Sequence, residues 1–185
     1  PGLPNRYLVE QCGIKPSQIT AVTFTNKAAG EMRQRLEEHF QNKRMVRSMT
    51  IGTFHSICLQ MLSKWREHVS VIDQYEALSI VEDLIAQQGS KLSPRDALEC
   101  ISKIKNGMMD REESPLSTSL CDAYCARMKQ ADALDYDDIL LEVLEHFKSL
   151  EKPDKKLLKP FTHLLVDEFQ DINPIQYELI QLWGQ

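Results

Sequence analysis

Segments typical of buried β-strands lie near both ends of this chain, and a long stretch with only helical patterns separates them. Ile19–Phe24 and Phe161–Val166 are apolar or β-branched runs, and Met49–Phe54 is a third, shorter run. Such runs, each followed by a helical pattern, indicate a parallel sheet covered by helices on both faces. The sequence therefore predicts an α/β fold whose sheet is assembled from the two ends of the chain.

The stretch between these ends reads as helical almost throughout. Apolar residues recur at helical spacing, Ser93-Pro94 is a typical helix start, and no strand pattern of weight occurs between residues 57 and 156. We expect helices at 6–12, 27–40, 56–65, 73–88, 94–104, 120–133, 136–150 and 174–183. This pattern predicts a first part of a sheet domain at 1–56, an inserted all-helical subdomain at 57–156, and a return to the sheet domain at 157–185.

The strongest chemical signal is the segment Val166-Asp167-Glu168-Phe169-Gln170-Asp171. An acid that follows a buried parallel strand lies at the carboxyl edge of the sheet, where α/β proteins bind ligands. In this position Asp167 would hold Mg²⁺ on nucleotide phosphates, Glu168 would orient and deprotonate a water, and Gln170 would sense the γ-phosphate. The alternative is an ordinary acidic turn, with Asp171 or Asn173 capping the last helix.

The sequence contains no phosphate-binding loop to accompany these acids. None of its seven glycines belongs to a GxxxxGK[ST] motif, in which backbone amides and a lysine cradle the phosphates. Without such a loop, two short carboxylates would hold a metal ion only weakly.

The net charge, the cysteines and the apolar segments limit the classes of protein to which this chain can belong. The net charge of −5 argues against nonspecific adhesion to nucleic acid. Residues 27–47 nevertheless carry a local excess of basic side chains, which is either a phosphate contact or an ordinary solvated helix face. The five cysteines form no CxxC pair, and no segment has the length and apolarity of a membrane span or a secretory signal. A reduced intracellular protein without membrane association is expected, cytoplasmic and nucleoid-associated if it is bacterial.

Four motifs resemble those of the UvrD/Rep/PcrA helicases of superfamily 1, in the same order and at approximately the same spacing. Thr23–Met32 is similar to motif Ia, Gly52–Ser56 to motif Ib, Leu134–Leu140 to an Asp-aromatic-Asp-Asp segment of the helical subdomain, and Val166–Asn173 to the Walker B motif. Together these matches cover essentially the whole chain.

The resemblance implies a partial RecA-like P-loop NTPase sheet with an inserted helical subdomain, and ATP and Mg²⁺ as cofactors of the parent protein. That protein would be an ATP-dependent DNA helicase that translocates 3′ to 5′ on single-stranded DNA and unwinds duplex junctions, for example in DNA repair. The Walker A loop would precede Pro1, and the second motor domain with its arginine finger would follow Gln185. We therefore expect the chain by itself not to turn over ATP.

The resemblance also implies a DNA-facing surface. Phe24 would stack on a base, with Thr25 and Asn26 beside it, and Thr53 and His55 would contact the phosphodiester backbone. The segment Tyr136–Asp138 would lie near the DNA path or the subdomain joint. Local sequence leaves other interpretations open, because Phe24 could belong to the core and His55 could be a structural histidine.

Two other functions are compatible with the same motifs. The chain could belong to the helicase subunit of a helicase–nuclease, which a downstream nuclease domain would reveal. It could also be a non-catalytic module that binds nucleic acid or protein on the same fold, which the lack of an upstream GxxxxGK[ST] motif would favour. The sequence does not identify protein partners or the DNA transaction served.

Overall fold

The computed structural model describes residues 3–184 and shows a mixed helix and sheet protein. In chain order its elements are α1 (Pro4–Glu10), η1 (Pro16–Gln18), β1 (Ile19–Thr23), α2 (Asn26–Phe40), α3 (Lys43–Arg47), β2 (Thr50–Thr53), α4 (Phe54–Leu62), β3 (Ser70–Val71), α5 (Gln74–Gln88), α6 (Pro94–Lys105), α7 (Thr118–Gln130), β4 (Ala133–Leu134), α8 (Tyr136–Ser149), α9 (Lys155–Leu158), η2 (Lys159–Phe161), β5 (His163–Val166), η3 (Phe169–Asp171) and α10 (Pro174–Trp183).

The main sheet has three parallel strands in the order β2-β1-β5. Its register pairs Ala21 of β1 with Ile51 of β2 and with Leu165 of β5. The prediction of a parallel sheet built from both ends of the chain is confirmed. All five residues of β1 are buried, as expected for the central strand, whereas the four residues of β5 are only half-buried.

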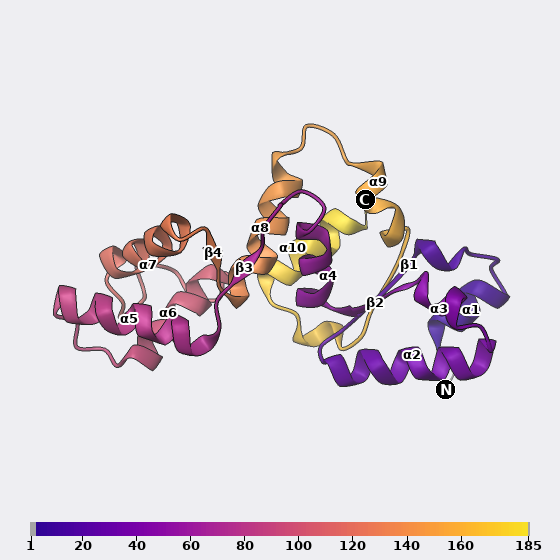
Figure 1. Ribbon diagram of the computed structural model, residues 1–185, viewed down its shortest axis with the longest axis horizontal. Coiled ribbons are helices and arrows are strands. Elements are labelled where there is room, and N and C mark those ends of the chain that lie inside the picture. Colours follow the sequence, from indigo (N-terminus) through magenta and orange to yellow (C-terminus); the bar gives the residue numbers. More distant parts are fainter. Residues whose placement is uncertain (1–2, 185) are drawn as a thin grey trace.

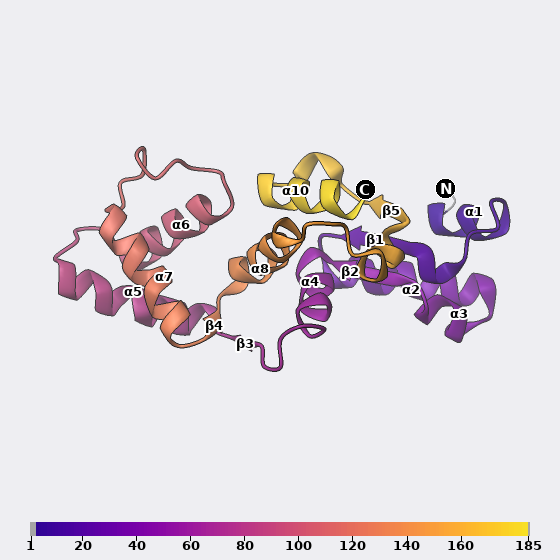
Figure 2. The same cartoon turned by 90° about the horizontal axis from the view of Figure 1, so that it is seen from above.

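Helices cover both faces of this sheet. Successive residues of a strand point to opposite faces, so neighbouring residues of β1 pack against different helices. Ala21 belongs to a hydrophobic cluster with Ala29 and Leu36 of α2. The next residue, Val22, belongs to a separate cluster in which α4, α8 and α10 pack together around Trp183. Figures 1 and 2 show these helices surrounding the strands at one end of the molecule.

A third hydrophobic cluster, here called the helical cluster, is formed by α5, α6 and α7. Its buried residues include Val81, Ile101 and Tyr124. Figure 1 shows these helices at the opposite end of an elongated molecule, with β3 and β4 between the two ends. Helix α8 and all but the first turn of α4 fall inside the predicted subdomain 57–156, but the apolar residues of both helices pack with the sheet.

Capping residues set the beginnings of the helices that position the site. Thr53, Asp135 and Asn173 each form a capping box at the start of α4, α8 and α10, respectively. In such a box the side chain accepts from a backbone amide one turn later, while the third helical residue bonds back. Helix α5 is closed by Gly89, the residue after its last, whose φ of 66° is the left-handed conformation that glycine adopts without steric cost.

The structure corrects the prediction that no strand occurs between residues 57 and 156. The two-residue strands β3 and β4 pair in parallel, with Ser70 opposite Ala133 and Val71 opposite Leu134. The predicted helix 120–133 therefore ends at Gln130, and the predicted helix 56–65 runs from Phe54 to Leu62. Helix α3 was also not predicted.

Candidate functional site

The ends of the three parallel strands meet at one edge of the sheet. The register pairs Thr23 with Thr53, and Val22 with Val166. The backbone amide of Asp167 continues the ladder by donating to the carbonyl of Val22 at 3.0 Å. The residues that follow β1, β2 and β5 therefore lie side by side at this carboxyl edge.

Residues 167–171, here called the acidic loop, leave the sheet in a tight turn. Asp167 and Glu168 are both exposed. Glu168 has a φ of 50°, a left-handed conformation that costs a non-glycine residue about 1–2 kcal/mol. Its amide donates to Oδ1 of Asp167 at 3.1 Å, and the amide nitrogen of Gln170 donates to its carboxylate.

The cap of the last helix is Asn173 rather than Asp171. Oδ1 of Asn173 accepts from the amide of Gln176 at 2.8 Å, and the Gln176 side chain accepts from the amide of Asn173 at 3.0 Å. The acids are thus not needed for capping.

The acidic loop suits a hard cation that is shared with another ligand. Within residues 3–184 no group of three or more His, Cys, Asp or Glu side chains is arranged to hold a metal ion. Mg²⁺, however, usually keeps several waters and binds through one or two carboxylates together with substrate phosphates. The oxygen donors of Asp167 and Glu168 fit that mode of binding.

Phe24 lies at the boundary between core and surface. Its side chain is 36% exposed, and its ring contacts Phe54 edge-on with centroids 6.0 Å apart. Thr25 is the cap of α2, because its hydroxyl accepts from the amide of Ala28 at 3.0 Å. Asn26 is exposed in the first turn of α2. Part of the Phe24 ring therefore packs against Phe54 of the core, and the rest of the ring is accessible to solvent.

Thr53 and His55 are more constrained than the sequence suggested. The hydroxyl of Thr53 accepts from the amide of Ser56 at 3.1 Å as the cap of α4. The imidazole of His55 stacks on the ring of Tyr136, with centroids 3.5 Å apart. Burial lowers the pKa of His55 to about 4, so the ring is neutral at pH 7 and can offer a hydrogen bond but no positive charge.

A buried ionic network, which the sequence did not predict, joins α6 and α7 to the start of α8. Nζ of Lys105 donates to Asp135 at 2.6 Å and to Asp138 at 2.8 Å, and the hydroxyl of Tyr124 donates to Asp135 at 2.9 Å. Burial acts to lower the pKa of Lys105, but the two carboxylates raise it above its ordinary value. Lys105 is therefore a permanent cation that orients the helix start carrying Tyr136.

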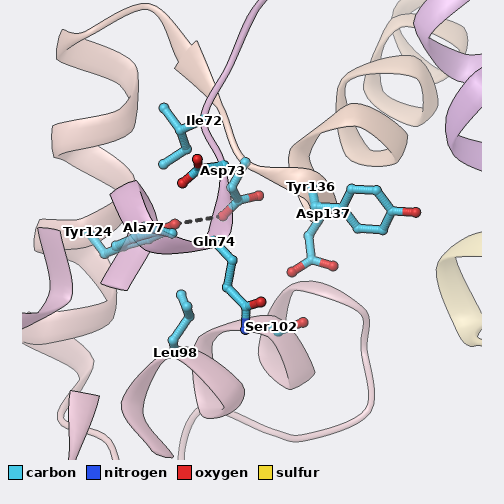
Figure 3. Close-up of a pocket in the computed structure, with 10 residues that line it drawn as sticks. Ile72, Asp73, Gln74, Ala77, Leu98, Ser102, Tyr124, Tyr136 and Asp137 are labelled. Carbon is cyan, nitrogen blue, oxygen red and sulfur yellow. Dashed lines mark hydrogen bonds between the residues drawn. The ribbon is translucent and has the colours of Figure 1, made fainter. Parts of the chain in front are cut away.

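A pocket of about 390 Å³ lies beside this network, between α5, α6, α7 and the start of α8. Figure 3 shows that the ring of Tyr136 points away from it, while the Asp137 carboxylate points toward the end of α6 that carries Ser102. The amide nitrogen of Asn106 donates to this carboxylate at 2.7 Å. The side chains of Tyr136 and Asp137 thus face different parts of the molecule.

The basic residues between 27 and 47 are exposed on α2 and α3. They are Lys27, Arg33, Arg35, Lys43, Arg44 and Arg47. In the part of the chain that the structure describes, none of them lies within ion-pair distance of an acid, although Arg33 donates to the carbonyl of Ile51 at 2.7 Å. Unpaired surface cations of this kind remain available to an anionic partner.

The cysteines and the lengths of the helices were also considered as indicators of function. Cys121 and Cys125 are free thiols on α7, and burial, followed by the charge of Cys125, raises the pKa of Cys121. Across residues 3–184, every helix is too short or too polar to cross a lipid bilayer.

Comparison with known proteins identifies a family model that the sequence matches. The sequence model of the UvrD/REP helicase N-terminal domain matches residues 5–184. Similar curated proteins include the ATP-dependent DNA helicase PcrA of Staphylococcus epidermidis, 28% identical over 95% of this chain and 26% of its own length. PcrA of Staphylococcus aureus is 27% identical over the same shares, and YjcD of Bacillus subtilis is 31% identical over 95% of this chain and 25% of its own length. The chain thus spans about a quarter of the length of these relatives.

Proposed function

Because this chain belongs to the family of UvrD/REP helicase N-terminal domains, we propose that it is part of the first motor domain of an ATP-dependent DNA helicase. The observation that carries the proposal is the shared carboxyl edge of β1, β2 and β5. One side of this edge carries the acidic loop, and the other carries Phe24 and the caps of α2 and α4. Such an edge suits an enzyme that must respond to a nucleotide and to DNA together.

On this proposal the three strands belong to a larger RecA-like sheet. The half-buried state of β5, compared with the buried β1, supports a sheet that extends beyond β5 in the whole protein. The helices between residues 57 and 156 would be the inserted subdomain. Their closest link to the sheet is through α4 and α8, which share its hydrophobic cluster.

In ATP hydrolysis the residues of the acidic loop would have separate roles. Asp167 would be a ligand of Mg²⁺, which neutralises charge on the transferred phosphoryl group when it is bound. Glu168 would accept a proton from the attacking water. Gln170, which holds the Glu168 carboxylate in this structure, would exchange that bond for one to the nucleotide. The chain by itself would not turn over ATP, since no sequence of the GxxxxGK[ST] type is present.

The DNA-facing residues would bind single strands without sequence preference. Phe24 would stack on a base, and Thr25, Asn26, Thr53 and the neutral His55 would offer hydrogen bonds to the backbone. The exposed cations of α2 and α3 would add a salt-dependent attraction. Translocation from 3′ to 5′ and the opening of duplex junctions would follow from the two motor domains acting together.

The experiment that tests this function uses the full-length protein and the variant Glu168→Gln. ATP turnover should be abolished, whereas nucleotide binding measured by calorimetry should be retained. Glu178→Gln is the matched control, since Glu178 is a surface acid of α10 that pairs with Lys148 at 2.8 Å. ATP turnover that survives in Glu168→Gln would refute the role of Glu168, and a wild-type protein without turnover would favour a non-catalytic module.

A further inference from the structure

The end of α6 is docked onto the start of α10, although the two are far apart in the sequence. The amide nitrogen of Asn173 donates to Oδ1 of Asn106 at 3.1 Å. The next residue of each segment is also close to its counterpart, since a Cβ atom added to Gly107 would lie 3.4 Å from Cβ of Pro174. Gly107 has a φ of 67°, so the turn itself favours glycine. The helical cluster therefore contacts the helix that follows the acidic loop.

Asn106 makes a bridge at this contact because it uses both ends of its amide. Its oxygen accepts from Asn173, while its nitrogen donates to the carboxylate of Asp137 at 2.7 Å and to the carbonyl of Ser102 at 2.9 Å. The side-chain amide of Asn173 also makes a hydrogen bond at each end. Its nitrogen donates to Asn106, and its oxygen caps α10 by accepting from the amide of Gln176 at 2.8 Å. An aspartate at position 173 could still cap the helix, but it could not donate to Asn106.

The two ends of this bridge belong to different parts of the candidate site. Asp137 follows Tyr136, which stacks on His55 of α4. Asn173 follows η3, in which Gln170 donates to the carboxylate of Glu168. The path from the His55–Tyr136 stack to the acidic loop therefore runs through two adjacent asparagine side chains.

We propose that Asn106 is a positioning residue that couples DNA binding at the His55–Tyr136 surface to ATP turnover at the acidic loop, through its hydrogen bond to Asn173. This inference rests on the proposed helicase function and names a residue that regulates the same site. Asn106 touches neither reactant. It fixes the start of α10, and with it the acidic loop, relative to the start of α8. Removing the bridge should leave both binding surfaces intact but weaken their communication.

The first test compares ATP turnover with and without single-stranded DNA in the full-length protein. The informative variant is Asn173→Asp, which retains the cap of α10, removes the donor to Asn106 and adds one negative charge, whereas Asn173→Ser retains a cap without adding charge. Asn106→Ala removes the bridge from the other side. Both should lower the stimulation by DNA about 5-fold or more, the lower range for coupling between sites, while the Kd for single-stranded DNA stays within about twofold. Unchanged stimulation in both variants would overturn the proposal.

A matched control separates this effect from the loss of any side-chain amide. Gln88 of α5 also bridges two helices, since Oγ of Ser119 donates to its oxygen at 2.9 Å, but it lies on the helical cluster away from the acidic loop. Gln88→Ala should retain full stimulation. An equal loss of stimulation in Gln88→Ala would show a general weakening of the helical cluster and would overturn the specific role of Asn106.

The second test uses the full-length protein and does not depend on ATP turnover. Hydrogen exchange of the amides of residues 168–172 should become faster in Asn173→Asp and Asn106→Ala, while exchange in α5 and β1 stays unchanged. If the full-length wild type shows no ATP turnover, the proposed function fails, but this measurement still decides whether the bridge holds the loop. Unchanged exchange at residues 168–172 in both variants would overturn the positioning role.

Discussion

The ring of His55 lies almost flat on the ring of Tyr136, with centroids 3.5 Å apart and an angle of 11° between the planes. The two residues come from the starts of α4 and α8, which pack in the same hydrophobic cluster as the sheet. The stack buries a titratable group that exchanges its proton near neutral pH in an unfolded chain. The stability of the protein should therefore depend on the state of this one imidazole.

We expect this imidazole to destabilise the folded chain in mild acid. Burial lowers the pKa of His55 from 6.5 to about 4. Between these values the unfolded chain binds the proton and the folded chain resists it, so the free energy of unfolding falls as the pH is lowered. The stabilisation is fully present above pH 6.5 and is lost towards pH 4. Because the ring is partly exposed, we expect a loss of about 1–2 kcal/mol.

Urea unfolding of the wild type and of His55→Gln at pH 7 and pH 4.5 measures this term. The wild type should lose more stability between the two pH values than His55→Gln does. His68→Gln, which removes an exposed histidine of the segment after α4, is the control. Identical pH dependence in the wild type and His55→Gln would contradict the prediction.

Replacing Lys105 by methionine should destabilise the protein strongly. The change leaves Asp135 and Asp138 close together without their shared cation, and breaking a buried ion pair from one side costs about 3–5 kcal/mol. Lys103→Met on the same helix removes only an exposed contact with Glu99 and should have a small effect. Thermal unfolding of both variants makes the comparison, and similar melting temperatures would show that the network adds little.

Substituting Phe24 by leucine should weaken binding of single-stranded DNA by the full-length protein. Leucine preserves the apolar contact with Phe54 but removes the ring that would stack on a base, and one such stack is worth about 1–3 kcal/mol. Fluorescence anisotropy with an oligothymidylate at fixed salt measures the change in Kd. Tyr75→Leu removes an aromatic ring of α5 that is 83% exposed, and it should leave the Kd unchanged. An unaltered Kd in Phe24→Leu would assign Phe24 to the core.

The left-handed backbone of Glu168 should make the folded protein less stable than a glycine at this position would. Glu168→Gly should raise the free energy of unfolding by about 0.5–1 kcal/mol, because glycine adopts a φ of 50° without the steric cost of a Cβ atom. Gln41→Gly, at a φ of 52° after α2, should give a similar gain by the same mechanism and serves as the comparison. A loss of stability in Glu168→Gly alone would mean that contacts of the Glu168 side chain outweigh its backbone strain.

Local chemistry explains which elements the sequence could predict. The strands β1 and β5 were predictable because their runs of apolar and β-branched residues are long and continuous. Helix α3 was not, because Lys-Arg-Met-Val-Arg shows no apolar period, and its one fully buried residue, Val46, is held by contacts with other elements. The strands β3 and β4 are only two residues long, which is too short for a period-2 pattern, and in addition the residues of β3, Ser70 and Val71, are exposed.

The candidate site was predictable only where its signal is continuous in the chain. Asp167, Glu168 and Gln170 lie within four consecutive positions after a strand, and the parallel sheet places them at its carboxyl edge. Thr25 and Thr53 are hydroxyl residues before helices, a pattern typical of caps, but only DNA contacts were predicted for them. The partners of His55, Lys105 and Asn106 are distant in the sequence and therefore leave no local pattern.

The pairing of β3 with β4 has a mechanical consequence. The chain crosses between the sheet and the helical cluster twice, and these two crossings are hydrogen-bonded to each other, with a further bond of 2.9 Å from the amide of Ile72 to the carbonyl of Leu134. A single strand would act as a swivel with several free torsions. Two strands joined side by side have fewer free torsions, so the helical cluster is held to the sheet more firmly than one crossing of the chain would hold it.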